Sequence, residues 1–267
     1  MRGLFLDRLK NRLTDRVAGH SIGLMTDETH GRLVLIPGLG VDEGLFAPQR
    51  EAFPQIECPS WIEHHHGESL RSYAHRLAAT IEPGGPMVLG GQSFGGMLAL
   101  EIARVLQPRA VILIASCRSA KSIPAPFWWL EAASRLMSDK MARRIVLAQT
   151  SAIVWRLGCS DEATRRFLEQ RLSDASISFI RWAVHAIRRW TFDARLPMPV
   201  YHIHGQRDRL IPVKNVNADV EVAGAGHLLN MTHREQVNSF IRDCLERTLT
   251  PRTQPAIQSI LSSDTPT

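Results

Sequence analysis

The sequence of 267 residues has few cysteines, no long apolar run and no cluster of basic residues. The four cysteines, Cys58, Cys117, Cys159 and Cys244, lie far apart and form no Cys-x-x-Cys pair. This spacing argues against a zinc cage and a disulfide-dense scaffold, so we expect reduced and mostly buried thiols. The longest apolar runs, such as Ala110 to Ala115, are far shorter than the roughly 20 residues of a membrane-spanning helix, so no integral membrane span is expected.

Charge and composition narrow the classes of function further. The sequence has 32 Lys and Arg against 26 Asp and Glu, a net charge of +6, but the two signs are interleaved almost everywhere. No basic block that could follow a phosphate backbone is present, and we therefore expect no nucleic-acid partner. Apolar residues make up 44% and charged residues 22%, as in ordinary globular proteins, and the length allows one large domain with an insertion.

The first 31 residues show no signal-peptide pattern, because charged residues interrupt the apolar ones from Arg2 onward. A cytoplasmic location is therefore the default expectation. Apolar positions between Phe5 and Val17 recur at about helical spacing with basic residues between them, which favours a loosely packed leading helix over an amphipathic membrane anchor. We assign residues 1–31 to an N-terminal extension, with the leading strands missing or reduced to a short run near Ser21–Met25.

From residue 32 onward, short runs rich in Leu and β-branched residues alternate with helical patterns, which predicts a parallel sheet covered by helices. The predicted strands are Arg32–Ile36, Ile56–Pro59, Pro86–Leu89, Ala110–Ala115, Val200–His204 and Ala218–Val222. Apolar residues at helical spacing predict helices over Ser69–Ile81 and Met97–Leu106. The predicted class is α/β, with a mostly parallel, doubly wound sheet.

Residues 118–195 break this alternation and predict a helical insertion. They show no convincing strand, contain five of the six tryptophans, and carry 14 basic against 7 acidic residues. The α/β core is then formed by residues 32–117 and 196–248. Residues 249–267 are rich in Ser, Thr and Pro and are expected to form a disordered tail.

The strongest motif is a buried-strand run that ends at Gly91-Gln-Ser93-Phe-Gly95 and is followed at once by a helical pattern. A sharp turn between strand and helix strains the backbone so that a serine hydroxyl stands clear of the sheet, and the flanking glycines avoid steric clashes. Ser93 is therefore the candidate nucleophile. A glycine-rich turn without chemistry is the alternative reading.

A neutral serine is a poor nucleophile and needs a base, which in turn needs an orienting group. Asp208 lies just beyond one predicted strand, and His227 lies in a glycine-rich loop just beyond the next. Because the carboxyl ends of parallel strands meet at one edge of a sheet, both side chains are expected near Ser93. Taken singly, Asp208 could equally start a turn and His227 could fill a surface loop.

Acyl transfer also needs hydrogen-bond donors that face the developing oxyanion. The run Leu35-Ile-Pro37-Gly-Leu39-Gly40 predicts a strand followed by a glycine turn, which brings the backbone N–H of Leu39 next to that of Phe94. An ordinary strand exit is the alternative for this run.

Together these segments resemble the α/β-hydrolase superfamily, from about Gly31 to Thr248. The matching residues are Gly91, Ser93 and Gly95 of the serine turn, His204, Gly205, Asp208 and Pro212 of a His-Gly-x-x-Asp-x-x-x-Pro segment, and Gly226 and His227. The resemblance implies a serine hydrolase with a Ser-His-Asp triad, a helical lid after the sixth strand, and no cofactor. Residues 118–195 occupy that lid position.

Several features qualify this reading. Only Arg209 to Asn217 link the last two predicted strands, so that connection is expected to be no more than a single helical turn. The three consecutive histidines His64, His65 and His66 cannot all face one metal ion, and they predict a solvated loop with no metal site. No Asp or Glu occurs between Ser116 and Leu130, which favours Asp208 as the acid.

The predicted activity is hydrolysis of a carboxylic ester or thioester of a small, partly hydrophobic substrate through an acyl-enzyme on Ser93. Trp128 and Trp129 line a substrate pocket or pack the lid helices together. The positive charge of the insertion permits an anionic group in the substrate, including an acyl carrier protein as partner. Lactone opening, carbon–carbon cleavage and perhydrolysis use the same triad, and a ligand-binding receptor with the same fold is the non-enzymatic alternative.

Overall fold

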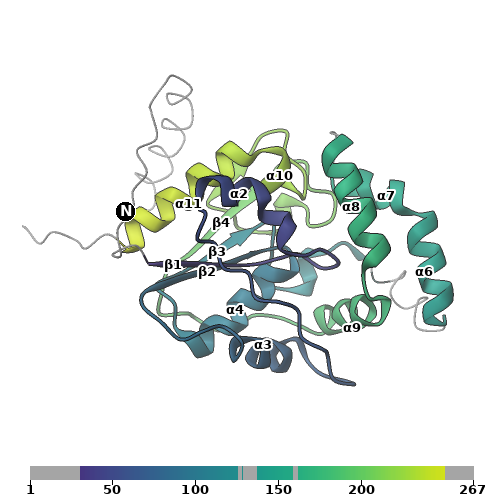
Figure 1. The fold of residues 1–267 in the computed structure, drawn as a ribbon, viewed down its shortest axis with the longest axis horizontal. Helices are drawn as coiled ribbons and strands as arrows, with labels where there is room; N and C mark the ends of the chain where they lie inside the picture. Colours follow the sequence, from purple (N-terminus) through teal and green to yellow (C-terminus); the bar gives the residue numbers. More distant parts are fainter. Residues whose placement is uncertain (1–30, 126–127, 129–136, 159–161, 250–267) are drawn as a thin grey trace, which may run out of the picture.

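The computed structural model describes residues 31–125, 128, 137–158 and 162–249 (Figure 1). The predictions for the N-terminal extension before residue 31, for Trp129 and for the tail after residue 249 lie outside the described residues. In the part of the chain that the structure describes, no helix is both long enough and apolar enough to cross a membrane.

The described residues form one parallel sheet whose five strands lie in chain order. The strands are β1 (Arg32–Ile36), β2 (Met87–Gln92), β3 (Ala110–Ile114), β4 (Val200–Gly205) and β5 (Val220–Val222). β1, β2 and β3 are almost entirely buried, which explains why each was recognisable as a short apolar run, whereas β4 and β5 at the edge carry more polar residues. The predicted α/β class with a parallel sheet is confirmed.

The predicted strand over Ile56–Pro59 is wrong. In this segment only Glu57 pairs with β1, in an isolated bridge to Val34, where its N–H and C=O bond to Leu33 and Leu35. Pro59 has no N–H with which to continue a ladder, so the chain leaves the sheet after a single residue.

Helices cover both faces of the sheet (Figure 1). One face carries α3 (Leu70–Ala78) and α4 (Phe94–Leu106). The helices of the other face are η1 (Glu43–Phe46), α2 (Ala47–Ala52), α10 (Leu229–Thr232) and α11 (Arg234–Leu249). Successive strand side chains point to opposite faces, so alternate residues of β1 enter the two hydrophobic clusters.

The described part of residues 118–195 contains helices and no strand beyond a single bridge between Ser119 and Thr191. Its helices are η2 (Ala120–Ser122), α6 (Asp139–Ala148), α7 (Thr150–Arg156), α8 (Glu162–Asp174) and α9 (Ile177–Arg188). They follow β3, and α6 to α9 lie together at one end of the molecule (Figure 1). We call residues 137–188 the helical segment, and its function as a lid stays a prediction.

The connection between β4 and β5 is short, as expected from the sequence. It contains the single 3-10 turn η3 (Val213–Asn215), yet β4 and β5 still pair in parallel. The loops after β1, β2, β4 and β5 therefore all leave the same edge of the sheet.

Candidate active site

Ser93 lies between β2 and α4 in a strained backbone conformation, with φ of 53° and ψ of −116°. Such a conformation is rare for a residue with a side chain, and here it turns the hydroxyl away from the sheet. The glycines on either side are needed for close packing. A Cβ atom on Gly91 would collide with the backbone of Gly95, and one on Gly95 would collide with the carbonyl oxygen of Ile36.

Asp208 lies in the turn that follows β4 and is 5% exposed. Its Oδ1 accepts hydrogen bonds from the backbone N–H groups of Leu210 and Ile211, each at 2.8 Å. These two bonds fix one carboxylate oxygen to the loop and leave Oδ2 facing the interior of the site.

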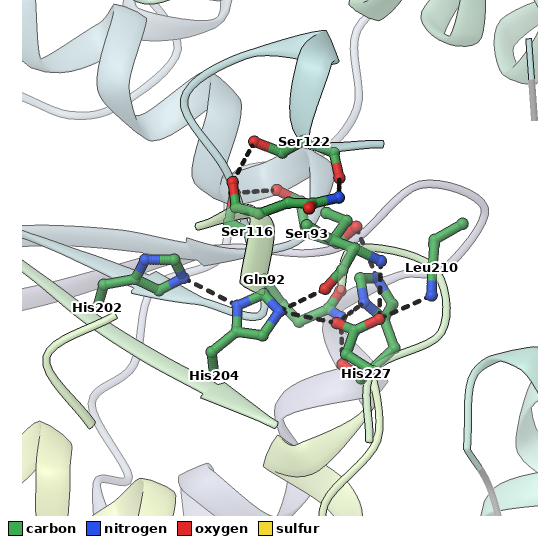
Figure 2. Close-up of polar contacts among 11 residues, drawn as sticks. Gln92, Ser93, Ser116, Ser122, His202, His204, Leu210 and His227 are labelled. Atoms are coloured by element: carbon green, nitrogen blue, oxygen red, sulfur yellow. Dashed lines mark hydrogen bonds and ion pairs between the residues drawn. The ribbon is translucent and has the colours of Figure 1, made fainter. Parts of the chain in front are cut away.

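His227 joins the other two side chains (Figure 2). Its Nδ1 is 2.7 Å from Oδ2 of Asp208, and its Nε2 is 2.9 Å from Oγ of Ser93. The structure thus brings together three residues that the sequence places 19 and 134 positions apart. The hydroxyl is within reach of an imidazole nitrogen that can accept its proton.

The electrostatics of Asp208 favour its ionised form. Burial by itself would raise the pKa of this carboxyl group, but the adjacent rings of His227 and His204 outweigh burial and lower the pKa below its ordinary value. The carboxylate therefore stays negative at neutral pH and can hold His227 with Nδ1 as the protonated nitrogen.

The backbone N–H groups of Leu39 and Phe94 are the predicted oxyanion donors. Phe94 is the first residue of α4, where a helix N–H has no acceptor within the helix. Within the described residues, the N–H of Leu39, in the turn after β1, also has no hydrogen-bond partner. Both predicted donors are thus available to an oxyanion.

Two residues around the site were not singled out from the sequence. Gln92 is 1% exposed, and its Nε2 donates to the carbonyl oxygen of His227 at 3.0 Å. Ser116 Oγ donates to the carbonyl oxygen of Ser93 at 2.7 Å. The sequence did contain a signal for Gln92, because it is a polar residue at the end of an otherwise apolar strand. Buried polar groups are normally hydrogen-bonded, so a partner for Gln92 could have been expected.

The end of α7 contacts the loops that carry the base and the acid. The carbonyl oxygen of Leu157 accepts the N–H of His227 at 3.0 Å. Arg209, next to Asp208, donates to the carbonyl oxygen of Trp155 at 3.0 Å and lies over its ring at 4.1 Å. The helical segment is therefore attached directly to the candidate site.

A cleft of about 450 Å³ lies between the loop after β1, the loop before α3 and the helical segment. Its lining residues include Gly40, which follows Leu39, and the aromatic side chains of Trp61 and Phe179. Both rings also contact Phe94, at centroid distances of 5.9 and 6.4 Å, so the cleft adjoins the residue after Ser93.

Trp128 and the three consecutive histidines were also considered in the sequence analysis, and of these His64 lines the cleft. Trp128 is partly buried against the cluster that contains α3 and α4, and it is not among the described residues that line the cleft. His65 and His66 are exposed in a loop, whereas His64 stacks on Trp182 at 5.2 Å. In the described ranges, no group of His, Cys, Asp or Glu is arranged to hold a metal ion.

Comparisons with known proteins agree with this architecture. A model of the alpha/beta hydrolase family matches residues 33–240. Among solved structures, an esterase from Thermogutta terrifontis is 19% identical with a TM-score of 0.59, covering 83% of this chain and 92% of its own. An esterase from Rhodococcus sp. ECU1013 is 13% identical with a TM-score of 0.63, and the match covers 84% of this chain and 93% of the esterase. The enol-lactonase from Burkholderia xenovorans LB400 is 16% identical with a TM-score of 0.61, covering 80% and 91%. No curated protein matches the chain.

Proposed function

The chain belongs to the alpha/beta hydrolase family, and on that basis we propose that it hydrolyses a carboxylic ester or thioester through an acyl-enzyme on Ser93. The observation that carries the proposal is the continuous hydrogen-bonded path from Ser93 Oγ through His227 to Asp208. In this path a neutral hydroxyl, a base and a buried carboxylate have the order that nucleophilic catalysis requires.

In the first half of the reaction, Ser93 Oγ attacks the substrate carbonyl carbon as its proton passes to Nε2 of His227. The negative charge that develops on the carbonyl oxygen faces the N–H groups of Leu39 and Phe94. Asp208 stabilises the imidazolium that forms. Collapse of the intermediate breaks the bond to the leaving alcohol or thiol, which takes the proton from His227 and leaves an acyl group on Ser93.

In the second half, His227 removes a proton from water, and the resulting hydroxide attacks the carbonyl carbon of the acyl-enzyme. The tetrahedral intermediate again places its oxyanion at the same two N–H groups. Its collapse returns the proton to Ser93 Oγ and releases the carboxylic acid. Every proton is transferred by His227, so no metal ion or cofactor is required by this scheme.

The cleft supports a small, partly hydrophobic substrate. Trp61 and Phe179 give it an apolar wall next to Phe94, and Arg171, paired with Asp42 at 3.2 Å, adds charge at its rim. Apolar pockets with a few polar groups are typical of small-molecule sites. The excess of basic residues in 118–195 supports an anionic group in the substrate or an acyl carrier protein as donor.

The test is turnover of short p-nitrophenyl esters, thioesters and lactones by the wild type and by Ser93→Ala. We expect the variant to lose at least about 10³-fold in kcat, and a fluorophosphonate to label the wild type at Ser93 alone. Ser72→Ala, which removes a surface hydroxyl on α3, is the control and should retain activity. Full activity of Ser93→Ala would contradict the proposal, and tight ligand binding without labelling would indicate a receptor.

A further inference from the structure

A second histidine contacts the same carboxylate oxygen as His227 (Figure 2). His204 Nε2 lies 3.1 Å from Oδ2 of Asp208 and 2.8 Å from the carbonyl oxygen of Ile211. His204 Nδ1 lies 3.0 Å from Nε2 of His202. Both histidines are on β4, two residues apart, so their side chains project from the same face of the sheet. His204 is 0% exposed and His202 is 5% exposed.

The geometry assigns the proton on His204. A ring nitrogen this close to two oxygens is repelled unless it carries a hydrogen, so Nε2 of His204 is a donor. The other ring nitrogen of His204, Nδ1, faces Nε2 of His202, and His202 has the backbone of Asn217 as a second hydrogen-bond partner. Burial, followed by the neighbouring ring of His204, lowers the pKa of His202 to about 3, so His202 stays neutral where hydrolases are assayed.

With this proton, four N–H groups lie against the carboxylate of Asp208. Two backbone N–H groups bind Oδ1 and Nδ1 of His227 binds Oδ2, while Nε2 of His204 makes its shorter bond to the carbonyl oxygen of Ile211 and contacts Oδ2 at 3.1 Å. The N–H of His204 thus lies between Oδ2 and the carbonyl oxygen of Ile211, in the loop that also binds Oδ1. It also withdraws part of the negative charge that His227 experiences.

We propose that His204 is a positioning residue that fixes Oδ2 of Asp208 and limits the negative charge that this carboxylate presents to His227. This inference rests on the proposed function, since it assigns His227 as the base. No step of the hydrolytic scheme passes a proton through His204, so its effect is exerted entirely through the carboxylate.

The direction of the effect follows from the charges. Negative charge on Oδ2 favours the protonated form of His227, which cannot accept the proton of Ser93. Loss of the His204 donor leaves more charge on Oδ2, so the acid limb of the activity profile moves to higher pH. The other charged groups near the two rings are Arg118, after β3, and Asp219, whose Oδ2 accepts the N–H of His202. Neither of them is changed by a substitution at His204.

The test compares His204→Leu, which removes the donor, with His204→Gln, whose amide N–H can occupy the place of Nε2. For His204→Leu we expect the midpoint of the acid limb of kcat/KM to rise by about half a pH unit or more. We also expect kcat to fall by roughly 10-fold while KM changes by less than about 2-fold. His204→Gln should restore the midpoint. A lower kcat with an unmoved midpoint in His204→Leu would show a merely structural role and overturn the inference.

A measurement on the unaltered protein covers the case in which His204→Leu does not fold. In protein labelled with ¹⁵N-histidine, NMR at the pH of the activity assay should show a proton on Nε2 of His204. His202→Gln and His227→Gln, in separate samples, assign the resonances. An unprotonated Nε2 on His204 would overturn the inference. The NMR result does not depend on activity, so failure of the proposed function, shown by an active Ser93→Ala, is distinguishable from failure of this one.

Discussion

The helices that flank the sheet and those of the helical segment are held in different ways. Ten of the thirteen residues of α4 are buried, whereas Ala142 is the one residue of α6 that is buried. Large apolar side chains of the segment are exposed, including Leu147 at 43% and Trp155 at 60%. Since buried apolar area is the main source of stability, α6 and α7 add little to the core, whereas α9 packs into it through residues such as Trp182 and Ala183.

Two of the contacts between the segment and the rest of the protein have different expected effects. At the end of α7, Leu157 and Gly158 pack against Gly226 and His227, next to the chemistry. On α9, Trp182 donates through Nε1 to the carbonyl oxygen of Glu68 at 2.9 Å, beside the cleft. The comparison therefore predicts that changes at the sheet edge alter kcat most, and that a change in the segment lowers kcat where it displaces the loop that carries His227.

The largest expected effect is that of Asp208→Asn, which removes a charge at the sheet edge. The amide cannot stabilise an imidazolium and can present its own N–H to His227, so kcat should fall by about 10³- to 10⁴-fold at neutral pH. Steady-state ester hydrolysis measures this loss. Asp139→Asn is the control in the segment, because it removes an exposed carboxylate that pairs with Arg181. A comparable loss in both variants would contradict the division between the two regions.

The next prediction compares two glycine variants, Gly158→Ala and Gly67→Ala, to distinguish the effect of backbone strain from the effect of contact with the site. Gly158 and Gly67 have similar positive φ values, 76° and 70°, but a Cβ atom on Gly158 would lie 2.8 Å from Cα of Gly226. A Cβ atom on Gly67 would meet nothing within 4 Å. Each change to Ala should therefore cost about 1 kcal/mol of stability through strain. Only Gly158→Ala should also displace the His227 loop and lower kcat, by roughly 10-fold.

Thermal unfolding and ester hydrolysis of both variants test this prediction. Equal kcat values for Gly158→Ala and Gly67→Ala would mean that the end of α7 does not position His227. A larger loss of kcat in Gly67→Ala would contradict the proposed attachment altogether.

Much of the fold was predictable because its signals are local. The strands of the core are short apolar runs, and the turn at Ser93 carries glycines that the packing of Gly91 and Gly95 against nearby backbone demands. The prediction of a strand over Ile56–Pro59 was wrong for a physical reason. This segment lies beside β1 and makes one bridge to it, but Pro59 lacks the N–H that a longer ladder needs.

The remaining features depend on contacts between distant parts of the chain. The sequence could place Asp208 and His227 at strand ends but not show that His204 shares the carboxylate, because that contact requires the turn after β4 to fold back on the strand. Likewise, Gln92 reaches a carbonyl oxygen 135 residues away. A polar residue inside an apolar strand indicates that a hydrogen-bond partner exists, but the sequence alone does not identify that partner.

The smallest expected effect concerns the loop to which α9 is attached. Arg76 donates to both carboxylate oxygens of Glu68, at 2.9 and 2.7 Å. These bonds, together with those from the N–H of His65 and the hydroxyl of Ser72, lower the pKa of Glu68 from 4.5 to about 2. Glu68→Gln should therefore lose about 1–2 kcal/mol in the free energy of unfolding at pH 7. Urea unfolding of the variant and the wild type measures the difference.

The pH dependence of this loss distinguishes an ionic bond from mere packing. Because the folded pKa of Glu68 is depressed, its contribution is complete above about pH 5 and declines as the pH falls from 4.5 towards 2. The difference between wild type and Glu68→Gln should narrow over that range. Glu63→Gln, in the same loop, should cost less than about 0.5 kcal/mol. A difference for Glu68→Gln that stays constant with pH would mean that packing, rather than charge, holds the loop that supports α9.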